Sequence, residues 1–226
     1  MITYIRHGES EFNSKGILQG NDDPELSLKG IDQAEALADR LKDMRGVSIF
    51  SSPLKRALQT ARIVASRIET DIDVIEDLKE IDIGQFSTLT WDQVKSKYPE
   101  LFPHPDITIW ELFRNNRIPG QEPYEAMVQR IARALSQIES RSNGGDPIIF
   151  GHGGFLRVFM AEQLGFRLER ESFKIDNTSI TLFDYTARTA TFYRINDIHH
   201  LARQFWNNRR NHSELYPAWI VSSVNL

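Results

Sequence analysis

Cysteine is absent from this chain of 226 residues. Disulfide bonds, thiolate-bound zinc and cysteine nucleophiles are therefore excluded. Long hydrophobic runs are absent too, because no stretch of about 18 apolar residues is available to form a membrane-spanning helix. The first ten residues, MITYIRHGES, lack the basic start and apolar core of a secretory signal. We therefore expect a cytoplasmic protein that does not insert into a membrane.

An excess of positive charge is also missing. The chain carries 27 Lys and Arg against 31 Asp and Glu, a net charge of −4, whereas nucleic-acid-binding domains are usually strongly basic. We therefore expect neither nucleic acid nor an anionic membrane as a partner. Apolar residues make up 40% of the chain, enough for a core, and no linker or repeat divides it. We predict a single domain over residues 1–226 and leave its oligomeric state open, with a homodimer as one option.

Strands and helices alternate along most of the chain. Apolar runs predict strands at 2–5, 47–50, 72–75 and 148–150, and alternation predicts a hairpin over 179–185 and 189–195. Apolar residues at helical spacing predict helices over about 27–44, 54–65 and 155–164. Ser51, Ser52 and Pro53 predict the start of the second helix, with a hydroxyl cap followed by a proline. The order predicts an α/β fold with a largely parallel central sheet flanked by helices.

The stretch from 83 to 124 departs from this rhythm. It holds seven aromatic residues and five prolines, and we interpret it as an inserted, partly helical excursion. Its aromatics either form a small core of its own or roof a pocket for a partly apolar substrate. Its basic residues would suit an acidic substrate: Lys95, Lys97, Arg114 and Arg117. The segment from Ala202 onwards mixes aromatic and basic residues and is the second candidate for substrate specificity.

Polar clusters follow three of the predicted strands. They are Arg6-His7-Gly8-Glu9, the segment 51–56, and Gly151-His152-Gly153. Ligands bind at the carboxyl ends of parallel strands, so neighbouring strands would bring Arg6, His7, Arg56 and His152 to one rim. Arginine pairs bidentately with phosphate oxygens, and glycine lets backbone N–H groups approach an anion. The clusters therefore predict a phosphate-binding pocket.

Four motifs in order carry a family resemblance: RHGES, SSPLKRALQTA, LKEIDIG and GHGG. Together they resemble the histidine phosphatase superfamily, the phosphoglycerate-mutase-like proteins, with weaker echoes at DNTSIT and IND. The resemblance implies that His7 is a nucleophile that accepts the phosphoryl group and that Glu80 is the proton donor. It further implies a set of residues that bind the phosphoryl group or substrate: Arg6, Asn13, Gln19, Arg56, His152 and Gly153.

Each implied role has a physical reason. Flanking arginines disfavour a protonated imidazole and help to keep His7 a neutral nucleophile. They also stabilise the charge of the transferring phosphoryl group, while a carboxylic acid protonates the poor alkoxide leaving group. No His-Glu-x-x-His motif is present, and paired arginines would repel a divalent cation. We therefore expect neither a catalytic metal nor any other cofactor.

Other polar residues are weaker candidates. Glu76, Asp77 and Asp82 crowd Glu80 and are the next options for the proton donor. Ser51 is either a pocket residue or a helix cap. The pair at 199–200 is expected to be structural or exposed, and His104, among prolines, has no assigned role.

The expected activity is hydrolysis of a small phosphate monoester. The short spacing from Glu80 to His152 resembles the phosphatase members of the family more than the mutases. Ser87-Thr88 and the PGQEP segment depart from the familiar phosphatase pattern, which bears on substrate contacts. Phosphoglycerate-mutase-type transfer and non-catalytic binding of a phosphorylated ligand are the alternatives. The sequence leaves sugar phosphates, phosphoglycerates and nucleotide-like phosphates open as substrates.

Overall fold

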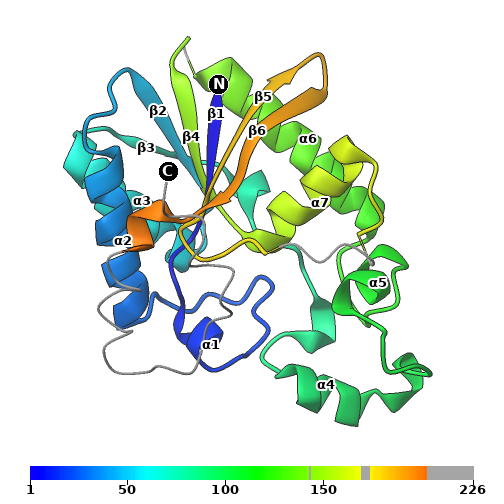
Figure 1. The fold of residues 1–226 in the computed structure, drawn as a ribbon. Coiled ribbons are helices and arrows are strands. Elements are labelled where there is room, and N and C mark those ends of the chain that lie inside the picture. Colours follow the sequence, from blue (N-terminus) through cyan, green and yellow to red (C-terminus); the bar gives the residue numbers. More distant parts are fainter. Residues whose placement is uncertain (143, 169–173, 203–226) are drawn as a thin grey trace, which may run out of the picture.

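The computed structural model describes residues 1–142, 144–168 and 174–202 (Figure 1). The aromatic and basic segment that follows Ala202 lies outside the described residues. Within the described ranges, no helix is long and apolar enough to cross a membrane.

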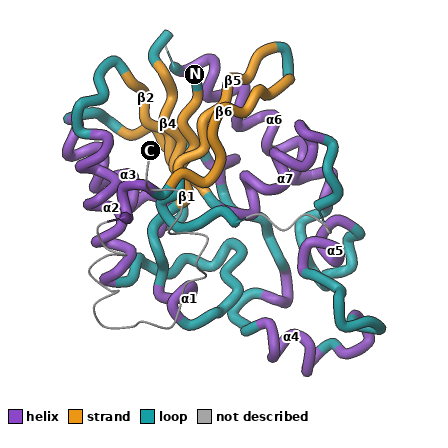
Figure 2. Tube along the Cα trace, in the orientation of Figure 1, coloured by secondary structure: helices purple, strands orange, loops and turns teal. Residues whose placement is uncertain are grey.

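A six-stranded sheet forms the centre of the fold (Figure 2). Its strands are β1 (Ile2–Arg6), β2 (Val47–Ser51), β3 (Ile72–Val74), β4 (Asp146–Gly151), β5 (Ile180–Thr186) and β6 (Thr189–Asp197). Their order is β3-β2-β4-β1-β5-β6, in which β1 to β4 are mutually parallel and the β5–β6 hairpin is antiparallel. The prediction of a largely parallel α/β sheet is confirmed.

Helices cover both faces of this sheet (Figure 1). Helices α2 (Leu28–Leu41) and α3 (Lys55–Ile68) lie on one face, and α6 (Tyr124–Arg141) and α7 (Gly153–Leu164) lie on the other. The short helices α1 (Glu11–Ser14), α4 (Trp91–Lys97) and α5 (Ile109–Arg114) lie beyond the end of the sheet. The apolar run of β4 is continuous because both faces of this strand are covered by helices. Ile148 and Phe150 pack with α2 and α3, whereas Ile149 belongs to the core on the α6 and α7 side. A strand buried on both faces has no polar side to present.

Helix α3 begins later than the sequence predicts. It starts at Lys55, with Leu54 at the N-cap and no capping side chain of its own. The predicted cap is wrong, because the Ser52 hydroxyl accepts the N–H of Leu54, which precedes the first helical residue, and lies 2.7 Å from Nε2 of His152. The first helical N–H, that of Lys55, donates to Asp23 in a distant loop at 2.6 Å.

The excursion over 83–124 is partly helical, as predicted, and contains α4 and α5. Its aromatics do not form a separate core. Phe86, Tyr98 and Phe113 belong to the same buried cluster as Tyr4 of β1 and Phe155 of α7. The excursion therefore packs against the α6 and α7 side of the sheet and shares its hydrophobic core.

Candidate active site

A cavity of about 240 Å³ lies where the parallel strands end. Most of the predicted site residues line it: Arg6, His7, Asn13, Gln19, Arg56, Glu80 and Gly153. His152 completes the set, because its ring lies 5.3 Å from that of His7, centroid to centroid. The carboxyl ends of β1 and β4 place the two histidines side by side, since Arg6 pairs with Gly151 in the sheet.

His7 is held in the tautomer that a nucleophile needs. Its Nδ1 lies 2.6 Å from the carbonyl oxygen of Gly8, and a carbonyl can only accept, so Nδ1 carries the proton. Nε2 is therefore left with a lone pair. Burial lowers the pKa of His7 well below its usual value, and the positive charges of Arg56 and Arg6 lower it further.

Two arginines surround this imidazole. Arg56 is fully buried and donates through its two terminal nitrogens to the carbonyls of Asp22, at 2.6 Å, and Gly20, at 2.8 Å. Arg6 donates to the carbonyl of Ile175 at 2.5 Å. Burial lowers the pKa of Arg56 to about 10, so the guanidinium stays charged at neutral pH. Both side chains are thus anchored by backbone oxygens.

His152 has a defined orientation too. Ser52 Oγ accepts the Leu54 N–H at 3.3 Å and lies 2.7 Å from Nε2 of His152. We assign the serine hydroxyl as the donor to Nε2, which places the imidazole proton on Nδ1. The Tyr4 hydroxyl fixes the backbone of the same residue, since it donates to the His152 carbonyl and accepts from the His152 N–H. Burial, followed by Arg56 and His7, lowers the pKa of His152 well below its usual value.

Three buried nitrogen atoms at the site have no hydrogen-bond partner in the part of the chain that the structure describes. They are Nε of Arg6, Nε of Arg56 and Nδ1 of His152. An unpaired buried donor costs roughly 1–3 kcal/mol, so three around one imidazole form a receptor for an acceptor-rich anion. A phosphoryl group, with several strong acceptor oxygens, fits these donors.

Glu80 belongs to the segment between β3 and α4. Its carboxylate lies against the first residues of α7 and lines the cavity. Its Oε1 accepts from the N–H groups of Ile81 and Phe155, and Oε2 accepts from that of Gly154 at 3.0 Å. A side chain on Gly154 would collide with this carboxylate. Oε2 therefore has one amide partner where Oε1 has two.

Arg130 of α6 fixes the segment that carries Glu80. It donates to the carbonyls of Asp77, Lys79 and Glu80 at 2.9, 2.7 and 3.1 Å, and it pairs with Glu122 at 2.7 Å. Of the four crowded carboxylates, all of them described, Glu80 alone lines the cavity. Glu76 pairs with Lys79, Asp77 with Arg133, and Asp82 accepts from the N–H of Gly84.

Asn13 and Gln19 reach the cavity from the loop around α1. Asn13 Oδ1 accepts from the Ser10 N–H at 3.2 Å, and Gln19 Oε1 accepts from the Ser10 hydroxyl at 2.6 Å. Ser10 therefore orients both amides by occupying their oxygens. The NH₂ groups remain available to donate to a ligand.

Several residues that shape the site carry no sequence prediction. Asn177 donates to the carbonyl of His7 at 3.0 Å, and only the weak DNTSIT echo points to it. Tyr4 and Arg130 are indistinguishable by pattern from an ordinary core tyrosine and a surface arginine. Arg157 and Trp110 line the cavity, although they lie on different helices and far apart in the sequence.

The predicted basic residues of the excursion point elsewhere. Among the described residues that line the cavity, none is Lys95, Lys97, Arg114 or Arg117. Lys95 lies over the Trp91 ring, Lys97 over Tyr98 and Arg114 over Tyr124. Each of these three cationic groups thus packs on an aromatic ring of the excursion, so the excursion contributes aromatic and aliphatic side chains to the cavity and no charge.

The remaining candidates lie outside the cavity. Ser51 is buried and donates to the Ser52 carbonyl at 2.9 Å, so it is neither a cap nor a lining residue. His199 is exposed and pairs with Asp197, while His200 contacts the Thr178 hydroxyl, in keeping with structural or exposed positions. His104 is exposed.

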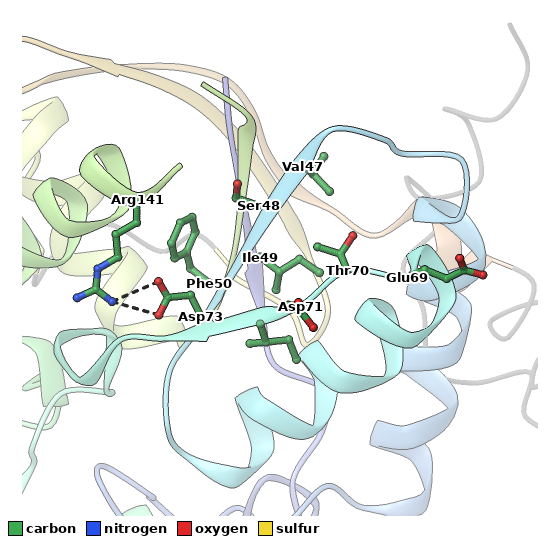
Figure 3. Close-up of a pocket in the computed structure, with 10 residues that line it drawn as sticks. Val47, Ser48, Ile49, Phe50, Glu69, Thr70, Asp71, Asp73 and Arg141 are labelled. Atoms are coloured by element: carbon green, nitrogen blue, oxygen red, sulfur yellow. Dashed lines mark hydrogen bonds and ion pairs between the residues drawn. The ribbon is translucent and has the colours of Figure 1, made fainter. Parts of the chain in front are cut away.

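A larger hollow, of about 600 Å³, lies at the β3 edge of the sheet (Figure 3). It is lined by backbone and side chains of β2 and β3, and by Arg141, which pairs with Asp73 at 3.1 Å. It contains none of the predicted catalytic residues, so size does not identify the active site here. No group of three or more His, Asp and Glu side chains suited to a metal occurs in residues 1–142, 144–168 and 174–202.

Comparisons with known proteins identify the family of this chain. The family model described as "Histidine phosphatase superfamily (branch 1)" matches residues 2–198. A metal-independent phosphoserine phosphatase of Arabidopsis thaliana is 34% identical over 160 residues, covering 70% of this chain and 66% of that protein. Phosphoglycerate mutase-like protein 4 of the same plant is 31% identical over 189 residues, covering 80% and 78%.

A solved structure extends the similarity to three dimensions. It is a mutant of the phosphoserine phosphatase from Entamoeba histolytica, with a histidine replaced by alanine, in complex with phosphoserine. It superposes with a TM-score of 0.71 at 26% identity, covering 88% of this chain and 98% of that one.

Proposed function

The chain belongs to the histidine phosphatase superfamily and is a phosphatase, and we propose that it hydrolyses small phosphate monoesters through a phosphohistidine on His7. The observation that carries the assignment to His7 is the set of three unpaired donors, among the described residues, around an imidazole whose Nε2 has a free lone pair. Donors fixed in advance stabilise transferring charge without reorganising, and each contributes about 3–4 kcal/mol in comparable sites.

The proposed first step transfers the phosphoryl group to the enzyme. Nε2 of His7 attacks phosphorus, the P–N bond forms and the bond to the ester oxygen breaks. Arg6, Arg56 and His152 donate to the phosphoryl oxygens throughout. Glu80 Oε2 gives its proton to the departing alkoxide, which leaves as an alcohol.

The second step returns the enzyme to its starting state. The ionised Glu80 takes a proton from water, whose oxygen attacks phosphorus. The P–N bond breaks, phosphate leaves and the lone pair returns to Nε2 of His7. Glu80 regains its proton, so no metal or cofactor is consumed or needed, in keeping with the metal-independent relative.

Trapping the intermediate tests this proposal. Brief incubation with ³²P-labelled ester and a denaturing quench should leave acid-labile, base-stable label on wild-type protein and none on His7→Ala. The His199→Ala variant, altered at an exposed histidine, is the matched control and should label normally. Label that survives acid, or that persists in His7→Ala, would contradict the assignment.

Mutase-type transfer is the second candidate, because several relatives, among them phosphoglycerate mutase-like protein 4 of Arabidopsis thaliana, bear phosphoglycerate mutase names. With 3-phosphoglycerate we expect free phosphate, or no reaction, in phosphorus NMR. Formation of 2-phosphoglycerate, stimulated by bisphosphoglycerate, would favour the mutase.

A further inference from the structure

The end of β1 is held by a loop that comes from a distant part of the sequence. Ile175 accepts from the Arg6 guanidinium through its carbonyl at 2.5 Å, and the Thr178 N–H donates to the Arg6 carbonyl at 3.0 Å. The Asn177 side chain donates from Nδ2 to the carbonyl of His7, also at 3.0 Å. This loop therefore contacts both the proposed nucleophile and the arginine beside it.

The loop has an unfavourable backbone conformation directly after Asn177. Thr178 has a φ of 57°, in the left-handed region, which a β-branched residue adopts only when its surroundings hold it there. The Thr178 side chain is fully buried, and its hydroxyl donates to the Asn177 carbonyl at 2.7 Å and lies 3.0 Å from Nε2 of His200. These contacts fix the backbone from which the Asn177 side chain extends.

The orientation of the Asn177 amide follows from its partners. The Ser10 N–H can only donate, so the Asn13 atom that lies 3.2 Å from it is the oxygen, Oδ1. The carbonyl of His7 can only accept, so the Asn177 atom beside it is the nitrogen, Nδ2. The same nitrogen lies 3.4 Å from Oδ1 of Asn13, a residue that lines the cavity. One NH₂ group thus contacts the backbone of the proposed nucleophile and an amide of the substrate cavity.

We propose that Asn177 is a positioning residue, whose NH₂ group holds the His7 peptide and the Asn13 amide in the geometry required for phosphoryl transfer. Asn177 is not one of the described residues that line the cavity, so it acts through these two partners. Because the Asn13 oxygen is occupied, the Asn13 NH₂ group is left to donate to the phosphoryl group. This inference rests on the proposed function for the role of His7.

Single-turnover kinetics, with enzyme in excess over p-nitrophenyl phosphate, measure the first step as release of nitrophenolate. Asn177→Ala should lower the rate constant at saturating enzyme by about 10- to 100-fold, because a small misplacement of reacting groups costs up to about 10²-fold. The dissociation constant, from the dependence of the rate on enzyme concentration, should change by less than about threefold, since the arginines that bind the phosphoryl group remain. A variant that is merely less stable would keep the saturated rate constant.

Two further variants separate the donor from its surroundings. Asn177→Asp keeps the shape but turns an acceptor towards two oxygen acceptors, so it should be slower than Asn177→Ala. Asn115→Ala removes an exposed asparagine whose Nδ2 donates to the Glu111 carbonyl at 2.9 Å, away from the cavity, and should leave both constants unchanged.

A double-mutant cycle tests the contact with Asn13. In the Asn13→Ala background, Asn177→Ala should lower the rate constant by a smaller factor than in the wild type, because the part of the effect that passes through Asn13 is already lost. Losses that simply multiply, or a wild-type rate constant in Asn177→Asp, would overturn the inference. Failure of the proposed function would look different, since the wild type itself would release no nitrophenolate and leave no label on His7.

Discussion

Removing the Tyr4 hydroxyl should weaken both the fold and the active site. Tyr4 is 1% exposed, and its hydroxyl accepts from the His152 N–H at 2.8 Å and donates to the His152 carbonyl at 3.0 Å. Burial, with a contribution from Glu80, raises its pKa well above the usual value, so the hydroxyl keeps its proton. Tyr4→Phe deletes only the oxygen and keeps the ring, which stacks on Phe155.

The size of the effect follows from what each partner loses. The His152 carbonyl keeps a second donor, the Leu156 N–H at 3.2 Å, so its loss is small. The His152 N–H has no replacement among the described residues, and a buried donor without a partner costs roughly 1–3 kcal/mol. We therefore expect Tyr4→Phe to lower the unfolding free energy by about 2 kcal/mol.

Activity should fall as well, because the same hydroxyl positions the backbone of His152, which we propose binds the phosphoryl group. We expect roughly a tenfold lower kcat with p-nitrophenyl phosphate, less than the 10²- to 10³-fold for complete removal of such a donor. Urea unfolding gives the stability and initial rates give kcat. Tyr193→Phe, which removes an exposed hydroxyl paired with Asp184, is the control and should change stability by less than about 0.5 kcal/mol. A change in unfolding free energy of less than about 0.5 kcal/mol for Tyr4→Phe would refute the reasoning.

Three other predictions concern the chemistry. Glu80→Gln should slow phosphoryl transfer from an alkyl ester by about 10²–10⁴, and from p-nitrophenyl phosphate much less, since nitrophenolate needs no proton; equal losses in pre-steady-state kinetics would move the proton donor elsewhere. Activity should survive a chelator and be inhibited by vanadate, which mimics a five-coordinate phosphoryl group; recovery only with added divalent ion would contradict this. His7 and His152 have pKa values well below the usual one, so the unfolded chain binds more protons below about pH 6.5. The unfolding free energy should therefore decrease as the pH is lowered below about 6.5, by up to about 1.4 kcal/mol per pH unit for each histidine. Urea unfolding at pH 7 and 5.5 measures this decrease, which should be smaller in His7→Ala.

The outline of the fold and the inner site could be predicted because their signals are local. Strand and helix periodicities are properties of short windows, and parallel strands bring their carboxyl ends to one edge. Arg6, His7 and His152 meet for that reason alone. Arg56 joins them because α3 follows β2 directly.

Local signals also misled where a side chain had two possible partners. The segment 51–53 reads as a helix cap, but the Ser52 hydroxyl is used by His152, one hundred positions away. The aromatics of the excursion favoured a separate core because nothing in the sequence shows what they pack against. No pattern drew attention to α6, although its Arg130 holds the Glu80 segment in place.

The sequence by itself determined the order of elements, the buried strands and the candidates for the reacting groups, because spacing and residue type suffice for these. Tertiary structure decided how each group is held and what meets it from across the chain. The Gly8 carbonyl sets the tautomer of His7, the Tyr4 hydroxyl hydrogen-bonds the backbone of His152, and the Arg157 guanidinium stacks on the Trp110 ring. Contacts such as the last two join residues widely separated in sequence, and their geometry depends on how two faces of a sheet and an excursion pack together. Hydrogen bonds and ring contacts act over a few ångströms, so only the folded coordinates reveal them.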